Sequence, residues 1–312
     1  MTRSRANAML LAISVIWGLA FIFQKTAMDH MGPLLFVALR CLVATVVLAP
    51  LAWLEGRRSS TDSLSTLGAL SPIAAFSGVM FFLGAGLQQI GLVTATVTNT
   101  GFITGLYVVI TPILAWAAFR VRPLSHVWGA AALAFIGTWF LGGGTVGGFS
   151  TGDMLVAISA IFWAAHMVVI EASSKHARPI TFTAIQFAVT GAIAFVFAFA
   201  FETVSWEAIQ AAWTEILFVG VLSSALTFTL LAVAMRHAPS TDAAILVAME
   251  TVFAALAAAI LLGERLSPIG WGGAAMMFAA TLIVQLVPGR RSVGAGGDAT
   301  PPAPPSTPTP AK

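Results

Sequence analysis

The amino-acid sequence predicts an all-α integral membrane protein whose ten transmembrane helices form two inverted-topology repeats of five helices. Three observations support this class: the composition, the spacing of the apolar segments and an internal repeat. Of the 312 residues, 58% are hydrophobic and 9% are charged, whereas soluble globular proteins have roughly 25% charged residues. So few charged side chains cannot cover a soluble surface, and we therefore expect most of the outer surface to face lipid.

Ten segments are long and apolar enough to cross a bilayer, which requires roughly 20 mostly apolar residues. Only helices and closed barrels satisfy their backbone in lipid, and these runs are too long and too uniformly apolar for barrel strands. The predicted spans are 7–28, 34–54, 68–90, 95–118, 124–142, 153–172, 179–200, 212–235, 242–262 and 268–287.

Most boundaries between the spans contain residues that interrupt a helix or that favour the aqueous surface. Proline cannot donate a backbone hydrogen bond, glycine is flexible, and charged side chains are costly to place in lipid. In chain order these boundaries are Gly32-Pro33, residues 55–58, Arg122-Pro123, residues 142–148, Arg178-Pro179 and residues 263–265.

The first span follows Arg3 and Arg5, as the core of a secretory signal peptide would. However, the apolar run over 7–28 is longer than such a core, contains Trp17 and Phe21, and lacks a clear small-x-small cleavage motif. We therefore interpret it as a retained transmembrane helix.

The positions of Lys and Arg predict the orientation, because cytoplasmic connections are enriched in these residues. With a cytoplasmic N-terminus, twelve of the 15 Lys and Arg residues lie on the cytoplasmic side. Lys25 and Arg265 lie on the opposite side, and Arg40 lies within a span. Both termini are then cytoplasmic. Basic residues confined to short connections also explain the net charge of +3 without nucleic-acid binding.

The C-terminal segment 288–312 differs in composition from the rest of the chain. It is rich in Pro, Gly, Ala and Thr and contains almost nothing apolar to bury. This composition predicts a disordered cytoplasmic tail.

The chain repeats itself once, at an offset of 143 to 146 residues. Each repeat holds five spans, an odd number, so the second repeat must be inverted relative to the first. Inverted repeats are common in secondary transporters, whose substrate site lies between them near the bilayer midplane. We expect one repeat over 7–143 and the other over 153–287. The matching segments are 11–16 with 156–161, 33–38 with 179–184, and 128–132 with 271–275.

Several short motifs also occur in an order and spacing that characterise one group of membrane carriers. Each motif is modest alone, but together they extend over nearly the whole chain up to the tail. In chain order they are Trp17-Gly18 followed by Phe21 and Lys25, PLLFVALRC at 33–41, LVAMETVF at 246–253, and GERLS at 263–267 before Trp271-Gly272.

These motifs resemble the EamA family of the drug/metabolite transporter superfamily. The resemblance implies a ten-helix inner-membrane carrier, usually an exporter of amino acids, other metabolites or toxic compounds. Where the family often has proline in the fourth and ninth spans, this chain has Val108 and Thr251. Pro112 lies one turn after Val108, so we expect any break in the fourth span to be displaced.

The fourth span presents four hydroxyl groups on one helical face, because Thr100, Thr104, Tyr107 and Thr111 are spaced four, three and four residues apart. Hydroxyl groups can replace part of a polar substrate's hydration. We therefore treat Thr100, Thr104 and Tyr107 as candidates for substrate binding. Hydrogen bonding and close packing between helices explain the same pattern equally well.

The first and sixth spans, which the repeat relates, each carry aromatic and polar residues on one face. Trp17, Phe21 and Gln24 share a face of the first span, and Trp163 and His166 share a face of the sixth. Around a common crevice, they would suit an amphipathic substrate, including a cation over a ring. Packing within the bundle is the alternative, above all for a lone histidine.

Glu250 lies near the middle of the ninth span and is the repeat mate of Tyr107 at an offset of 143 residues. A charge there costs roughly 2.5–3.5 kcal/mol on insertion scales, so we expect it to bind a substrate amine or to carry a proton. A structural carboxyl group is the alternative. Gln88 in the third span is a weaker cavity candidate, and we interpret Arg40 as snorkelling or pairing to stabilise the fold.

The sequence offers little support for other chemistry. Its only lysines are Lys25, Lys175 and Lys312, so it has no Walker A motif and cannot drive transport with ATP by itself. It has no H-E-x-x-H motif and no Cys/His cluster, so we expect no metal or other cofactor. A G-x-S-x-G match at 148–152 lies in a glycine-rich connection, where it does not indicate a hydrolase.

The expected function is secondary transport of small metabolites, such as amino acids or similar amphipathic solutes, by alternating access. The inverted repeat favours a carrier, and the resemblance favours export. Import, drug efflux by the same fold and an intramembrane enzyme remain alternatives. Expected partners are a small-molecule substrate and the lipid bilayer, with no obligate protein partner evident, and proton coupling is left open. We expect the site where the first, fourth, sixth and ninth spans meet.

Overall fold

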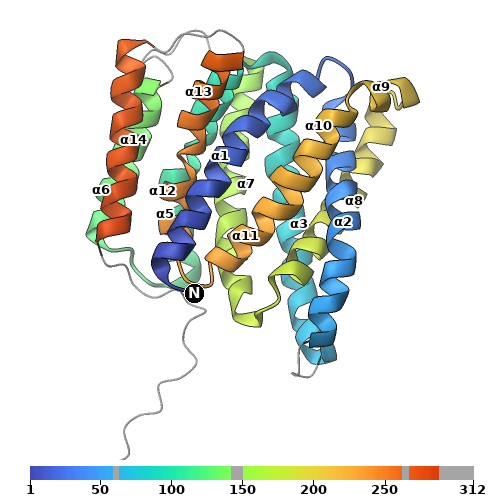
Figure 1. The fold of residues 1–312 in the computed structure, drawn as a ribbon, viewed down its shortest axis with the longest axis horizontal. Coiled ribbons are helices and arrows are strands. Elements are labelled where there is room, and N and C mark those ends of the chain that lie inside the picture. The colour runs from blue at the N-terminus through green and yellow to red at the C-terminus, as the bar shows by residue number, and fades with distance from the viewer. Residues whose placement is uncertain (59–62, 142–149, 262–266, 288–312) are drawn as a thin grey trace, which may run out of the picture.

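The computed structural model describes residues 1–58, 63–141, 150–261 and 267–287 (Figure 1). Within these residues all regular secondary structure is helical. In the described ranges, nine helical segments are long and apolar enough to span a membrane, and the 17-residue helix at 125–141 provides a shorter tenth crossing. These findings confirm the predicted fold class.

The ten crossings divide into two sets of five, and the fourth, eighth and ninth crossings each contain more than one helical segment. The first set comprises α1 (Arg3–Ala27), α2 (Pro33–Arg58), α3 (Ser63–Thr94), α4 (Val97–Thr104) with α5 (Tyr107–Phe119), and α6 (Ser125–Leu141). The second set comprises α7 (Thr151–Ser173) with the 3₁₀ turn η1 (Ser174–His176), α8 (Pro179–Phe201), the short α9 (Trp206–Ala211), α10 (Trp213–Leu217) with the π-helix η2 (Phe218–Leu226) and α11 (Thr227–Ala234), α12 (Ser240–Val247) with α13 (Glu250–Leu261), and α14 (Pro268–Leu286).

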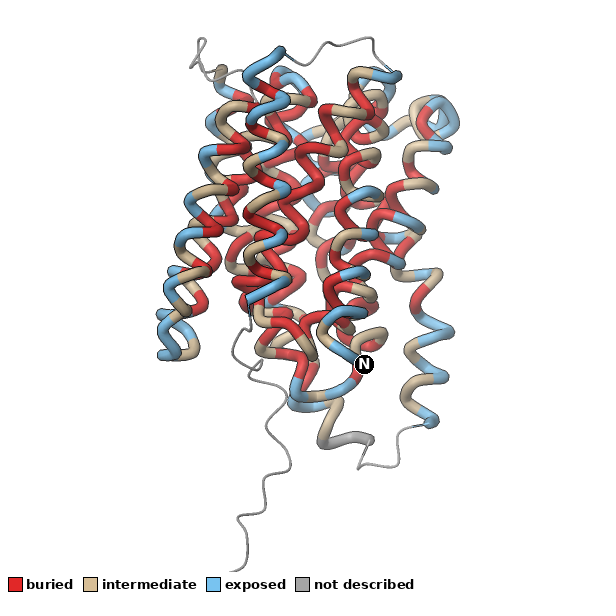
Figure 2. The backbone as a smooth tube through the Cα atoms, turned by 60° about the vertical axis from the view of Figure 1, so that its left-hand side comes forward, coloured by how far each residue is buried: buried red, intermediate tan, exposed pale blue. Residues whose placement is uncertain are grey.

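The helix contacts follow a pseudo-two-fold pattern, as the inverted repeat predicts. α2 packs on α8 and α6 packs on α14, so each of these pairs joins a helix to its own repeat mate. The contact of α3 with α7 has its repeat-related counterpart in the contact of η2 and α11 with α1. The contact of α1 with α13 likewise corresponds to that of α7 with α5. Buried residues fill the space between these pairs, whereas many outward faces are apolar and exposed, as a lipid-facing surface requires (Figure 2).

The fourth and ninth crossings are broken at equivalent positions. The fourth breaks at Gly105, between α4 and α5, and the ninth breaks at Ala248, between α12 and α13. At each break the helical ladder tightens: Val108 N–H donates to the Gly105 carbonyl and Thr251 N–H donates to the Ala248 carbonyl, both over 3.1 Å. The break therefore precedes Val108 and is not displaced toward Pro112. A 3₁₀-type turn creates it without proline.

Two carboxylates join the repeats at opposite ends of the α2–α8 pair. Glu202, at the end of α8, accepts hydrogen bonds from the backbone N–H groups of Leu34 and Leu35, each over 2.8 Å. Glu55, near the end of α2, accepts hydrogen bonds from the N–H groups of Ile180 (3.2 Å) and Thr181 (2.7 Å). Each carboxylate thus caps the first turn of the other repeat's second helix, where free N–H groups favour negative charge.

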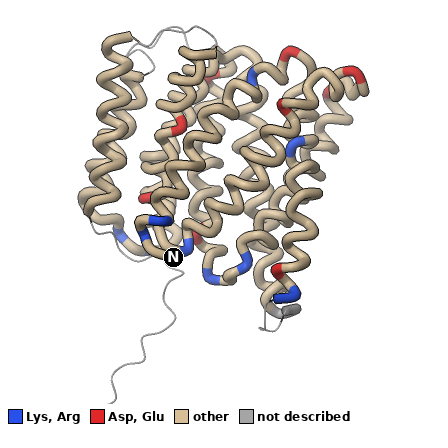
Figure 3. Tube along the Cα trace, in the orientation of Figure 1, with Lys and Arg blue, Asp and Glu red and all other residues tan. Residues whose placement is uncertain are grey.

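Among the described residues, Lys and Arg gather at the end of the bundle that holds the N-terminus (Figure 3). Lys25 lies in the last turn of α1, at the far end of that helix from the N-terminus, and Arg40 lies inside α2, as predicted from the sequence. The assignment of the basic end to the cytoplasm stays a prediction. The predicted tail at 288–312, the glycine-rich connection at 142–148 and Arg265 lie outside the described residues.

Candidate functional site

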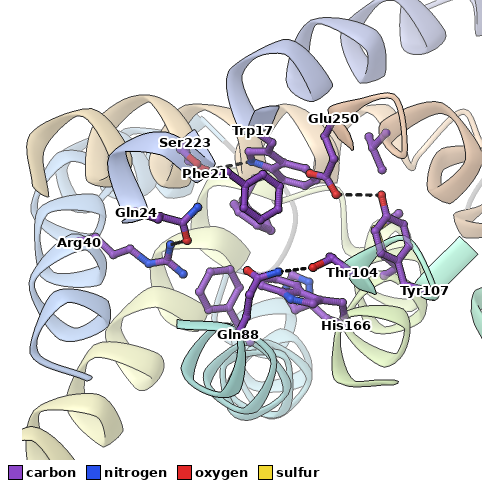
Figure 4. A pocket seen from close by; sticks show the side chains of 15 residues that line it. Trp17, Phe21, Gln24, Arg40, Gln88, Thr104, Tyr107, His166, Ser223 and Glu250 are labelled. Carbon is purple, nitrogen blue, oxygen red and sulfur yellow. Dashed lines mark hydrogen bonds between the residues drawn. The ribbon is translucent and has the colours of Figure 1, made fainter. Parts of the chain in front are cut away.

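A cavity of about 60 Å³, or about 590 Å³ when all the space between the lining atoms and at its open mouth is counted, lies midway along the broken helices (Figure 4). Helices from both repeats line it, because the pseudo-two-fold arrangement brings α1, α5, α7 and α13 together at the centre. The lining residues are Trp17, Phe21, Gln24, Arg40, Phe81, Gln88, Thr104, Tyr107, Trp163, His166, Met167, Ser223, Phe228, Val247 and Glu250.

Nine of the ten residues that the sequence suggested as candidates line this cavity, and Thr100 does not. Thr100 is fully buried, and its hydroxyl donates to the backbone carbonyl of Thr96 over 2.8 Å. Thr111, on the same predicted face, also lies outside the lining and donates to the carbonyl of Tyr107. For these two threonines the structure shows bonding back to the preceding helical turn. Substrate binding by the other nine stays a prediction.

Glu250 and Tyr107 meet at the centre of the molecule. The Tyr107 hydroxyl donates to Glu250 Oε1 over 3.2 Å, and each residue begins the helix that follows its break. Gly18 makes room for this arrangement, since a Cβ there would lie 2.8 Å from the carbonyl oxygen of Glu250. The hydrogen bond therefore crosses the pseudo-two-fold axis between repeat mates.

Arg40 lines the cavity from α2 and is only 4% exposed. Its Nη1 donates to Gln24 Oε1 over 3.0 Å, and its guanidinium carbon lies 5.5 Å from the centre of the Phe81 ring. Of the two interpretations that the sequence offered for Arg40, snorkelling or pairing, the structure supports pairing, because the guanidinium lines the cavity and donates to Gln24.

Aromatic rings form much of the remaining wall, largely as repeat mates. Trp17 and Trp163 are 146 residues apart, and Phe81 and Phe228 are 147 apart with ring centres at 5.0 Å. The Trp17 indole donates to the Ser223 carbonyl over 3.1 Å. Apart from Arg40, five lining residues are not among the sequence candidates, and the repeat offset relates two of them, Phe81 and Phe228, to each other. The five are Phe81, Met167, Ser223, Phe228 and Val247.

His166 is held by a hydrogen bond that belongs to the second repeat. Its Nε2 lies 3.0 Å from Gln186 Oε1, and Gln186 is the repeat mate of Arg40 at an offset of 146 residues. Each repeat thus has a hydrogen-bonded polar pair between its first two helices. The pair in the first repeat, Gln24 with Arg40, includes a charged side chain, whereas the pair in the second, His166 with Gln186, includes no arginine or lysine. Within the part of the chain that the structure describes, no three His, Cys, Asp or Glu side chains are grouped to hold a metal ion.

Comparisons with known proteins agree with this architecture. The model of the EamA-like transporter family matches the chain twice, over residues 4–143 and 150–286. A protein of Archaeoglobus fulgidus, named as an uncharacterized transporter, is 31% identical over 291 residues, which are 91% of this chain and 87% of that protein. The uncharacterized transporter YwfM of Bacillus subtilis is 23% identical over 281 residues, 89% of this chain and 93% of its own.

A solved crystal structure shares the fold, with a TM-score of 0.75 at 15% identity over 91% of this chain and 98% of that chain. The family matches coincide with the two sets of five helices, and both relatives extend over most of the chain. This multi-pass membrane protein therefore belongs to the EamA-like transporter family.

Proposed function

We propose that this protein is a secondary carrier that exports small amphipathic metabolites, with amino acids or similar solutes as its substrates, by alternating access. The central cavity is the observation that supports this most. Both repeats line it, and their inversion means that opening the bundle first at one end and then at the other would expose the same cavity to each side of the membrane in turn. The export direction is supported by the family resemblance.

The cavity wall suits an amphipathic solute. Aromatic rings offer apolar surface, while amide, hydroxyl and charged groups offer hydrogen bonds. One such pair is formed by Gln88, whose Nε2 donates to Thr104 Oγ1 over 2.7 Å. A few polar groups within a mostly apolar wall are typical of small-molecule sites.

Two polar contacts at opposite ends of the bundle support the proposal of alternating access. At one end, Lys25 Nζ donates to the carbonyl of Leu92 over 2.8 Å and to that of Ala95 over 3.1 Å. At the other end, Glu171 accepts a hydrogen bond from the N–H of Ser240 over 2.8 Å. Lys25 and Glu171 are 146 residues apart, so each repeat fastens the end of its first helix to the connection before its fourth. We call them the end contacts, and alternating access requires them to break in turn.

The test is transport by the purified chain in proteoliposomes preloaded with labelled phenylalanine or leucine. The expected result is saturable efflux of unchanged solute, faster than from protein-free liposomes. Adding an uncoupler reports on protons, because coupled transport collapses whereas exchange or facilitated diffusion persists. In cells, export predicts resistance to toxic amino-acid analogues, whereas an importer would increase sensitivity. Absence of protein-dependent movement overturns the proposal, and chemical conversion of the solute would identify an intramembrane enzyme.

A further inference from the structure

Two ionisable side chains line the central cavity without a partner of opposite charge. Arg40 and Glu250 are each only 4% exposed, and neither forms an ion pair with any described residue. Figure 4 shows them on opposite sides of the cavity, with the ring of Phe21 between them. Burying an unpaired charge is costly, so two such groups around one cavity indicate a ligand that compensates both.

The Arg40 side has spare hydrogen-bond donors. A guanidinium remains charged in proteins and presents five N–H groups in a planar fork that matches a carboxylate. The hydrogen bond to Gln24 uses one nitrogen, Nη1, whereas Nε is buried and has no hydrogen-bond partner. The amide of Gln24 neutralises no charge, so the fork lacks an anion.

The Glu250 side has spare acceptors. The hydrogen bond from Tyr107 occupies one of its two carboxyl oxygens. An ionised carboxyl group accepts about four hydrogen bonds, so there is capacity for the three N–H donors of an ammonium group. The rings of Trp17, Phe81 and Trp163 line the same space and offer apolar contact to the rest of a ligand.

We propose that Arg40 binds the carboxylate of a zwitterionic substrate, that Glu250 binds its ammonium group, and that its apolar side chain packs against the rings. This inference rests on the proposed function and specifies the charge pattern of its substrate. It also makes recognition directional, because the repeat mate of Arg40, Gln186, is uncharged and is bonded to His166 and Ser77. A carrier with one cation on one side of its pseudo-two-fold axis binds a zwitterion in a single orientation.

The first experiment needs no substitution. Titration calorimetry in detergent measures dissociation constants of the full chain for phenylalanine, for phenethylamine, which lacks the carboxylate, and for 3-phenylpropionate, which lacks the amine. Leucine, isoamylamine and 4-methylpentanoate form a second series with a branched aliphatic side chain. In at least one series the zwitterion is expected to bind roughly tenfold or more tightly than either singly charged compound, because each charged contact is desolvated.

The second experiment assigns the two contacts to residues. In the series that shows the advantage, Arg40→Gln is expected to remove the preference for the zwitterion over the amine while changing the affinity for the amine by less than about threefold. Glu250→Gln is expected to remove the advantage over 3-phenylpropionate, and Arg40→Lys to restore part of the carboxylate preference. Arg178→Gln is the matched control, since Arg178 is 5% exposed but lies outside the cavity, and its affinity ratios should equal those of the wild type.

The outcomes separate this inference from the proposed function. Equal wild-type affinity for the zwitterion and the amine in both series overturns the role of Arg40, even if transport in proteoliposomes is confirmed. Equal loss of affinity for all three compounds in Arg40→Gln also overturns it, because that is the effect of a structural arginine. Wild-type protein that neither binds nor transports any of the six compounds overturns both proposals.

Discussion

Neighbouring turns of α4 show how one residue reaches the cavity while a similar residue does not. Thr100 and Thr104 are both buried, and both hydroxyls donate to the carbonyl four residues earlier. Only Thr104 also accepts a hydrogen bond from a cavity side chain, Gln88. The pair is therefore a matched comparison of a lining hydroxyl with a buried hydroxyl outside the cavity.

We expect Thr104→Val to weaken the apparent affinity for a transported solute by about threefold to tenfold, because it leaves the Gln88 amide without its acceptor inside the cavity. Thr100→Val should leave that affinity unchanged, since the hydroxyl it removes bonds to the carbonyl of Thr96, the N-cap of α4, and not to a cavity side chain. Concentration-dependent efflux from proteoliposomes measures both. Equal losses in the two variants would show that the hydroxyls act through helix packing and not through the cavity.

Among helices, the two carboxylate caps on the α2–α8 pair explain how the repeats hold together at both ends. Because Glu55 and Glu202 act on helices more than 120 residues away, no local pattern in the sequence predicts them. Each carboxylate accepts hydrogen bonds from N–H groups in the first turn of a helix, which have no partner within that helix. We therefore expect both caps to stabilise the fold, whichever side of the membrane the cavity faces.

Glu55→Ala and Glu202→Ala should each lower the free energy of unfolding by about 1–2 kcal/mol, as loss of a charged helix cap does. The two losses should add in the double variant, because the caps lie at opposite ends of α2. Thermal unfolding of the purified chain in detergent measures the effect. Glu207→Ala, at an exposed position on α9, is the control. If Glu55→Ala and Glu202→Ala destabilise the protein no more than Glu207→Ala does, this account is contradicted.

The break in the fourth crossing depends on a close approach between α4 and α6. A Cβ on Gly105 would lie 2.9 Å from Thr138 Cγ2, whereas a Cβ on Gly101, one turn earlier, would meet nothing nearer than 3.9 Å. Gly105→Ala should therefore cost about 1–3 kcal/mol of stability through overpacking. Gly101→Ala should be neutral or stabilise by up to about 1 kcal/mol through helix propensity. Thermal unfolding of the two variants measures the difference in stability. Equal effects would show that the close contact with Thr138 is not what requires glycine at position 105.

For the whole molecule, the ten crossings and the inverted repeat follow from hydrophobic length and a constant offset, which is why the sequence predicts them. Helical spacing also identifies the polar face of each helix, and nine of ten candidates on such faces line the cavity. The spacing does not reveal how far a helix is rotated toward its neighbours, so the inward direction of Arg40 and the buried position of Thr100 outside the cavity required the packed structure. The helix breaks at Gly105 and Ala248, which occur without proline, also depend on contacts between helices that the sequence alone does not reveal.

The end contacts make alternating access testable in the intact carrier. Cys41 is the one cysteine of the chain and is buried, so Cys41→Ala with Ser223→Cys places a single thiol in the cavity wall. In that background, Lys25→Gln should speed modification by a membrane-impermeant maleimide added on the Lys25 side and slow it from the other side. Glu171→Gln should do the reverse, because weakening one contact shifts the population toward the state open at that end. Faster modification from both sides in either variant would indicate a loosened bundle, and unchanged rates would show that these contacts do not control access.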